Sequence, residues 1–341
     1  MRIEGGSEAS PAFQSLFMQD PAVGHRLRPG ARARYTTVEF TTDLAINGEG
    51  VRDDEEIGPK APNERRIVIL GDSLVLSVQV AFAQTFGERL EAELNAAGGP
   101  VDWRVINGGV QGYGPVDEWL FYDHVAAAFD PDIVLVVAFV GNDAVEAADK
   151  ESWLAGRVEA VDAGEVALNR LRRLVRSSMV LQQARIRYDQ IKAKLQGPGP
   201  ERPLTTYLSD PPPDIARGLD VTRRAFGMIA DRAAARGARA ALVLMPARFQ
   251  TDDVDYGQLA AIVHAAGGEL VRNAATDRFE AALKPLGLPM LDLQPVLAAQ
   301  PDRIGLFFQR NVHLTPRGHG VVARALFDFL ESSGLAASAA R

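Results

Sequence analysis

The chain has 341 residues, of which 47% are hydrophobic and 24% charged, and its formal net charge at pH 7 is −7. This composition supports a sizeable core, in one large α/β domain or two smaller ones. The negative charge argues against general nucleic-acid binding. Because the chain has no cysteine, disulfides, thiolate metal sites and a cysteine nucleophile are excluded. No apolar run approaches the roughly 18 residues that a membrane span needs.

The first 62 residues are irregular and rich in turn formers, apart from one alternating stretch at 33–42. Its period of two and its β-branched residues predict an exposed strand, one arm of a hairpin. We therefore expect a β-rich N-terminal appendage over residues 1–62. Residues 1–20 lack the basic-then-apolar pattern of a secretory signal. Two compartments stay open: the cytoplasm, or a secreted or periplasmic location whose leader or anchor is not in this sequence.

From residue 66 onward the pattern alternates between strands and helices. Strands are predicted at 67–70, 103–107, 133–138, 240–245 and 289–293, and helices at 80–97, 116–128, 215–236, 269–286 and 317–332. The run at 133–138 is continuously apolar and β-branched, as expected of a central parallel strand covered on both faces. This alternation predicts an α/β fold over residues 63–335, a three-layer α/β/α sandwich around a parallel sheet.

A helical insertion at about 144–214 interrupts this pattern. Within it, the segment 168–195 combines apolar residues at near-helical spacing with many arginines and lysines. Two interpretations stay open for this basic segment: a solvated helix face, or a surface that binds an anionic polymer, a phosphate or a membrane. Because the insertion leaves the sheet at its carboxyl edge, we predict that it forms a lid over the site.

The tripeptide Gly71-Asp72-Ser73 directly follows the first predicted strand. Glycine frees the backbone for a sharp exit, and the serine then lies at the carboxyl edge of a parallel sheet, where open α/β folds bind their ligands. Its hydroxyl is also suited to cap the following helix. Taken alone, the tripeptide is more typical of a surface turn, since all three are turn residues.

Three more segments fall where strands should end. The glycine-rich loop within 105–114 can turn backbone N–H groups inward, as an oxyanion hole requires. Asn142, just past the central strand, carries an amide that can donate to an oxyanion. His313 precedes the last helix and is the histidine best placed to reach the same edge. Taken singly, each segment also has a purely structural interpretation. The glycine-rich segment fits a flexible loop, Asn142 a turn that ends a strand, and His313 a loop histidine whose hydrogen bonds are structural.

Together the four segments resemble the motifs of the SGNH (GDSL-type) hydrolases, which are serine esterases and acyl hydrolases with a flavodoxin-like fold. The resemblance covers about residues 66–330, without the insertion. It implies that Ser73 is the nucleophile and His313 the general base. It further implies an oxyanion hole formed by the backbone N–H groups of Ser73 and Gly112 and by the Asn142 side chain. No cofactor or metal is implied, the expected partner is a small-molecule or glycan ester, and the oligomeric state is not determined.

One position departs from the family pattern. The family usually has an aspartate two or three residues before the histidine, where this chain has Asn311 and Arg310. Four alternatives follow: a Ser–His dyad helped by a backbone carbonyl, an acid from elsewhere (Asp302 or Asp292), a deliberate substitution, or a non-catalytic homologue. The predicted function is a serine ester hydrolase acting on carbohydrate O-acyl or small esters. The alternatives are an O-acyltransferase and a non-catalytic glycan-binding protein.

Overall fold

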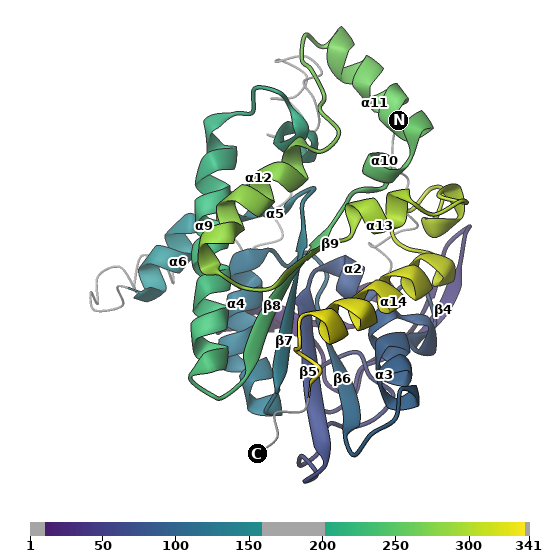
Figure 1. The fold of residues 1–341 in the computed structure, drawn as a ribbon, viewed down its shortest axis with the longest axis vertical. Coiled ribbons are helices and arrows are strands. Elements are labelled where there is room, and N and C mark those ends of the chain that lie inside the picture. The colour runs from purple at the N-terminus through teal and green to yellow at the C-terminus, as the bar shows by residue number, and fades with distance from the viewer. Residues whose placement is uncertain (1–10, 159–201, 338–341) are drawn as a thin grey trace.

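The computed structural model of the protein describes residues 11–158 and 202–337 (Figure 1). Its centre is a parallel sheet in the order β6-β5-β7-β8-β9. The strands are β5 (Glu64–Gly71), β6 (Asp102–Gly109), β7 (Ile133–Phe139), β8 (Arg239–Met245) and β9 (Met290–Asp292). This is the flavodoxin-like order 2-1-3-4-5, whose switch point lies between the first and third strands, here β5 and β7. The predicted three-layer α/β fold is confirmed.

Helices cover both faces of the sheet (Figure 1). One face carries α4 (Pro115–His124), α9 (Pro213–Ala234) and α12 (Ala274–Leu283), and the other carries α3 (Phe86–Ala96) and α14 (Pro316–Ser332). Along β5, Val68 and Leu70 join one apolar cluster while Ile67 and Ile69 join the other. Because successive side chains point to opposite faces, a strand covered on both sides is apolar throughout.

Shorter elements complete the described chain. The short α-helices are α2 (Ser73–Leu76), α5 (Asp143–Asp149), α6 (Glu151–Val158), α10 (Arg248–Thr251) and α13 (Gln294–Ala298), and a longer helix, α11 (Asp253–Ala265), was not predicted. The 3-10 helices are η1 (Phe82–Gln84), η2 (Ala126–Phe129), η3 (Arg202–Tyr207), η4 (Lys284–Leu286) and η5 (Ile304–Leu306). No helix in the described residues is long and apolar enough to cross a membrane.

Two helices begin later than predicted. The helix expected at 80–97 begins only at Phe86, because the hydroxyl of Thr85 accepts the N–H of Glu88 and caps the helix there. The helix expected at 269–286 is α12 alone, since Leu270 forms an isolated bridge with Leu208 before the helix begins. In both regions a long-range or capping contact sets the boundary that periodicity left open.

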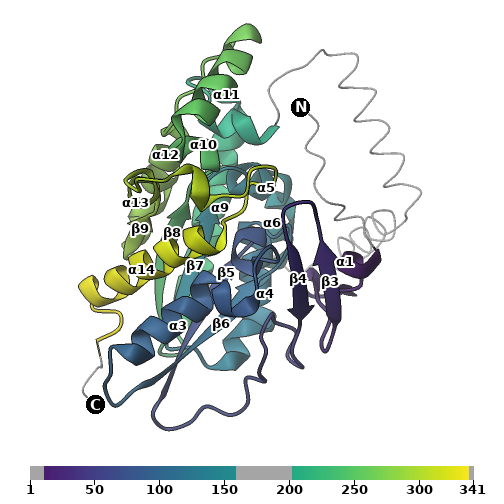
Figure 2. The ribbon, with the colours of Figure 1, turned by 90° about the vertical axis from the view of Figure 1, so that its right-hand side faces the viewer.

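The N-terminal appendage forms two small antiparallel sheets (Figure 2). One sheet pairs β1 (Phe17–Asp20) with β2 (Gly24–Leu27), after the short α1 (Pro11–Gln14). The other pairs β3 (Arg32–Thr36) with β4 (Thr41–Ala45), so the stretch 33–42 is two strands around a turn and not a single strand. Buried apolar residues of the appendage belong to the same cluster as those of α4 and α9. The appendage is therefore packed onto the α/β body.

The start of the predicted insertion packs into the core. α5 contacts α9 and contributes the buried residues Ala144, Val145 and Ala147 to the apolar cluster on that face. The basic segment 168–195 lies outside the described residues. The lid predicted for the insertion at about 144–214 and the membrane or anion contact predicted for the basic segment stay predictions.

Candidate active site

Ser73 is the first residue of α2, immediately after β5. The carboxylate of Asp72 accepts the N–H of Leu74 at 2.8 Å and caps the helix. The helix ends after one turn at Ser77, which has a left-handed backbone (φ 56°) and donates its hydroxyl to the carbonyl of Leu74 at 2.6 Å. The turn that carries Ser73 is thus fixed at both ends.

The same turn is tied to the neighbouring strand. The side-chain amide of Asn107 on β6 donates to the carbonyl of Val75 at 2.8 Å. A Cβ at Gly109 would lie 2.3 Å from the backbone nitrogen of Leu76, so only glycine lets α2 approach the end of β6 this closely. The second motif therefore helps to position Ser73 in addition to supplying a loop.

His313 lies in a loop between η5 and α14. An antiparallel bridge between Phe307 and Leu314 closes the loop, and the N–H of Phe308 donates to the carbonyl of His313 at 3.0 Å. The imidazole Nε2 lies 2.9 Å from the hydroxyl oxygen of Ser73. Burial lowers the pKa of His313 to about 4, so the ring is neutral at physiological pH. A neutral Nε2 can accept the proton of the Ser73 hydroxyl.

Asn311 holds the other side of the ring. Its Oδ1 lies 2.5 Å from Nδ1 of His313 and also accepts the backbone N–H of His313 at 3.2 Å. A backbone N–H only donates, so the oxygen of the amide, and not its nitrogen, faces the histidine. The group that orients His313 is therefore the side chain at the usual position of the family acid.

The predicted alternative of a remote acid is wrong. Asp302 forms an ion pair with Arg317, and Asp292 accepts the N–H of Gln294 at 2.8 Å. Within the described residues, neither carboxylate contacts His313. Both acids are instead used to fix the ends of nearby helical segments.

Gly112 and Asn142 lie at the same edge of the sheet as Ser73, because β6 and β7 end on either side of β5. Gly112 has a left-handed backbone (φ 72°), and no described residue accepts its N–H. The Nδ2 of Asn142 donates to Oε1 of Glu146 at 2.9 Å. A Cβ at Gly114 would lie 2.9 Å from Oε2 of Glu146, so this carboxyl lies close beside Gly114 as well as accepting from Asn142.

Sequence reasoning missed a group of buried carboxyls beside the site. Asp72 and Asp143 are chain neighbours of Ser73 and Asn142, and both are buried, as is Glu118 on α4. Burial raises the pKa of Asp72 to about 6 and that of Glu146 to about 8. Burial, followed by the mutual repulsion of these acids, holds the pKa values of Glu118 and Asp143 well above their usual range. At neutral pH Glu118, Asp143 and Glu146 therefore retain their protons, whereas Asp72 is mostly ionised.

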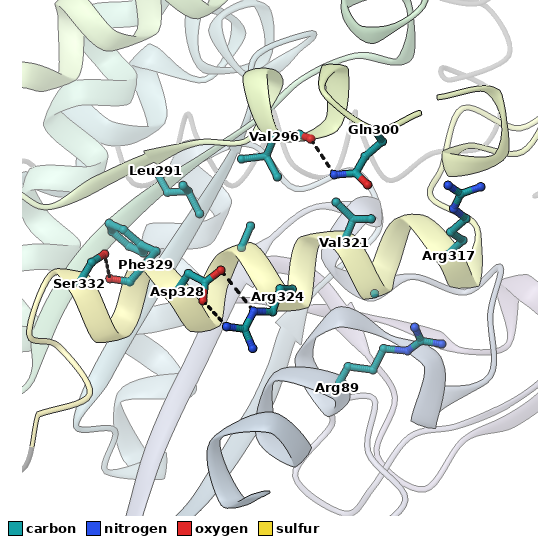
Figure 3. A pocket seen from close by; sticks show the side chains of 12 residues that line it. Arg89, Leu291, Val296, Gln300, Arg317, Val321, Arg324, Asp328, Phe329 and Ser332 are labelled. Atoms are coloured by element: carbon teal, nitrogen blue, oxygen red, sulfur yellow. Dashed lines mark hydrogen bonds and ion pairs between the residues drawn. The ribbon is translucent and has the colours of Figure 1, made fainter. Parts of the chain in front are cut away.

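The hollow shown in Figure 3, of about 820 Å³, runs along α14 on the α3 side of the sheet. Its lining combines apolar residues with arginines: Arg89, Leu291, Val296, Gln300, Arg317, Gly320, Val321, Arg324, Ala325, Asp328, Phe329 and Ser332. None of the predicted site residues is among them. We therefore do not assign this hollow to the substrate.

A serine in hydrogen-bond contact with a neutral histidine, at the carboxyl edge of a flavodoxin-like sheet, defines an SGNH-type arrangement. Residues 204–341 match the family model described as "SGNH hydrolase-like domain, acetyltransferase AlgX". This match covers less than half of the chain and includes His313, in agreement with the resemblance to the SGNH hydrolases that the four motifs predicted.

Several solved structures are similar at low identity. A lipase/acylhydrolase from Enterococcus faecalis is 11% identical with a TM-score of 0.44, covering 79% of this chain and 96% of its own. The esterase EstA from Pseudoalteromonas sp. is 10% identical with a TM-score of 0.43, covering 80% and 99%. A catalytic mutant of an acetylxylan esterase from Geobacillus stearothermophilus is 12% identical with a TM-score of 0.40, covering 80% and 95%. Likenesses this weak say nothing of the substrate. No curated protein matches the sequence.

Proposed function

We propose that the protein is a serine enzyme that transfers the acyl group of an ester to water, acting on carbohydrate O-acyl esters or small esters. The observation that carries this proposal is the 2.9 Å contact between the Ser73 hydroxyl and Nε2 of His313. Burial holds the pKa of this histidine near 4, so the base is unprotonated over most of the pH range.

In the first step, Oγ of Ser73 attacks the ester carbonyl carbon while its proton passes to Nε2 of His313. A new C–O bond to the serine forms, and the tetrahedral intermediate then expels the leaving alcohol. That alcohol takes the proton back from His313. The acyl-enzyme is next attacked by water, which gives one proton to His313, and the acid is released as Ser73 recovers its proton.

The negative charge of the tetrahedral intermediate needs hydrogen-bond donors. We assign them to the N–H groups of Ser73 and Gly112 and to the Nδ2 of Asn142, which lie at the ends of three adjacent strands. One N–H of the Asn142 amide donates to Glu146, which leaves the second for the oxyanion. Losing one such donor typically lowers turnover about 10²–10³-fold.

An O-acyltransferase is the second candidate, and one observation favours it. The family model that matches residues 204–341 is described as that of an acetyltransferase. The two activities share the acyl-enzyme and differ only in whether water or an acceptor hydroxyl attacks it. A transferase must exclude water from the acyl-enzyme.

The proposal is tested with p-nitrophenyl acetate and acetylated oligosaccharides, using the wild type, Ser73→Ala and, as a matched control, Ser209→Ala in an exposed loop. We expect p-nitrophenol release that is lost in Ser73→Ala and retained in Ser209→Ala. Equal amounts of p-nitrophenol and acetate indicate hydrolysis, whereas an acetate deficit with an added oligosaccharide indicates transfer. If no ester gives Ser73-dependent release, the catalytic proposal fails and a glycan-binding role replaces it.

A further inference from the structure

We infer that the N-terminal appendage is part of the active site and that Glu39, in the turn between β3 and β4, is a positioning residue for His313. The kinetic part of this inference rests on the proposed function, whereas its structural part does not. The turn lies beside the loop that precedes α14 (Figure 2).

The carboxylate of Glu39 accepts three consecutive backbone N–H groups of the histidine loop. Gln309 donates to Oε1 at 2.8 Å, Arg310 donates to both oxygens at 3.0 Å, and Asn311 donates to Oε2 at 2.9 Å. Hydrogen bonds to an ionised carboxylate are roughly twice as strong as those between neutral groups. Glu39 therefore fixes the backbone of Asn311, the residue whose side chain holds the imidazole.

The same loop is held from its other side. The guanidinium of Arg248 donates to the carbonyls of Phe308 and Gln309, at 2.9 and 2.8 Å. The ring of Phe40, next to Glu39, packs against the ring of Phe308 with centroids 5.3 Å apart. An anion on the N–H groups and a cation on the carbonyls together hold a loop that has no regular structure between Phe307 and Leu314.

The appendage also contacts two more loops of the site, those after β5 and β6. Arg52 is buried and donates to the carbonyls of Leu76, Ser77 and Val80, at 2.9, 2.5 and 2.6 Å, directly after the helix that Ser73 begins. His25 binds the carbonyl of Gln111 at 2.9 Å, next to Gly112. The loops that carry Ser73, Gly112 and His313 are therefore all in contact with the appendage, which helps to hold them in position.

Glu39 has a particular consequence for catalysis. Asn311 supplies no negative charge, so its only contribution to His313 is the position of its oxygen. A shift of the loop withdraws that oxygen from Nδ1, and the ring is then free to change tautomer or to turn from Ser73. Misplacement by about 1 Å can lower turnover about 10²-fold.

The first experiment follows the imidazole of His313 without reference to activity. Histidine-labelled full-length protein is examined by long-range ¹H–¹⁵N correlation NMR, with the His313 signals assigned by their loss in His313→Gln. We expect the wild type to carry its proton on Nδ1, and Glu39→Gln and Glu39→Ala to show a mixture of tautomers. The matched control is Asp43→Asn, on β4 of the same hairpin, whose exposed carboxylate pairs with Arg34 and does not touch the loop.

The second experiment measures p-nitrophenyl acetate hydrolysis and thermal unfolding for the same variants. We expect kcat to fall about 10- to 100-fold in Glu39→Ala and about 10-fold in Glu39→Gln, with KM and the unfolding midpoint little changed. Asp43→Asn should match the wild type in both. A wild-type tautomer in both Glu39 variants overturns the inference, as does wild-type kcat in an active enzyme. If the wild type has no Ser73-dependent activity, the proposed function fails and the NMR result alone decides the role of Glu39.

Discussion

Oδ1 of Asn311 accepts two hydrogen bonds from His313, one from the ring Nδ1 at 2.5 Å and one from the backbone N–H at 3.2 Å. The backbone bond fixes which atom of the amide faces the ring, and an oxygen there requires the proton to be on Nδ1. Nε2 is then free to accept from Ser73. The amide thus selects the tautomer that a general base needs, although it adds no charge to stabilise the imidazolium that forms during reaction.

Replacing Asn311 by aspartate should supply that missing charge. We expect Asn311→Asp to raise the plateau of kcat/KM about 10- to 100-fold, a smaller effect than the loss of about 10⁴-fold that the reverse change causes in a Ser-His-Asp protease triad. The pH at which kcat/KM falls on the acid side of the pH profile should also change. Burial holds the pKa of His313 at about 4 in the wild type. Because a nearby carboxylate favours the protonated ring, the substitution should raise this pKa, and with it the acid side of the profile, by about 1–3 pH units.

The measurement is a pH profile of p-nitrophenyl acetate hydrolysis from pH 4 upward, with Asn311→Ala as the control. Alanine removes the acceptor as well as the charge, so its plateau should lie below that of the wild type. Identical profiles for Asn311→Asp and the wild type would show that the missing carboxylate does not limit this enzyme.

Asn142 should act in the transition state rather than in binding. We expect Asn142→Ala to lower kcat about 10²–10³-fold with little change in KM, because the oxyanion exists only after the attack. Glu146→Gln is the matched comparison, since its side-chain oxygen can still accept from Asn142, and its loss should stay below about 10-fold. Steady-state kinetics on one ester decides the matter: a wild-type kcat in Asn142→Ala rules out this donor.

The sheet and the gathering of the motifs could be predicted because both follow from local patterns. The continuous apolar run at 133–138 became β7, since a strand covered on both faces has no room for polar side chains. Parallel strands share one carboxyl edge, so residues that follow β5 and β7 in sequence, such as Ser73 and Asn142, lie along that edge. The stretch at 33–42 was predicted as one strand, although it contains parts of two, because the turn at 37–40 has no glycine, proline or asparagine to mark it.

The contacts that hold the site together do not produce a recognisable pattern in the sequence. Glu39 precedes Asn311 by 272 positions, in a stretch where an exposed glutamate is ordinary. Arg52 binds carbonyl oxygens, which every residue possesses, so nothing in the sequence of 76–80 identifies its partner. The identity of the group that orients His313 likewise depended on where Asp302 and Asp292 point, which only the structure shows.

Gly109 should be intolerant of any side chain. A Cβ there would lie 2.3 Å from the backbone nitrogen of Leu76, so α2 must move and carry Ser73 with it. We expect Gly109→Ala to lower the free energy of unfolding by about 1–3 kcal/mol, the usual cost of overpacking, and to lower kcat. The control is Gly257→Ala in α11, where a Cβ meets nothing within 4 Å and alanine should stabilise the helix by about 0.5–1 kcal/mol. Urea unfolding of both variants provides the comparison, and equal stability of Gly109→Ala and the wild type would contradict the close approach of α2.

Glu118 should make the protein less stable as the pH rises. Both of its carboxyl oxygens are buried without a hydrogen-bond partner among the described residues, and burial, with the charges of Asp72 and Asp117, holds its pKa well above the usual range. Below the unfolded pKa both states keep the proton and the effect is absent. Above it the unfolded chain releases the proton while the folded protein retains it, so the free energy of unfolding falls until the pH passes the folded pKa.

Glu118→Gln cannot ionise and should escape this loss. We expect the free energy of unfolding of Glu118→Gln, relative to that of the wild type, to increase by up to about 1.4 kcal/mol per pH unit above roughly pH 4.5. A constant offset from the buried amide does not change this slope. Urea unfolding at pH 5, 7 and 9 measures the slope, and Glu331→Gln at an exposed position of α14 provides a control that should run parallel to the wild type. A constant difference between Glu118→Gln and the wild type across this range would mean that Glu118 is already ionised in the folded protein.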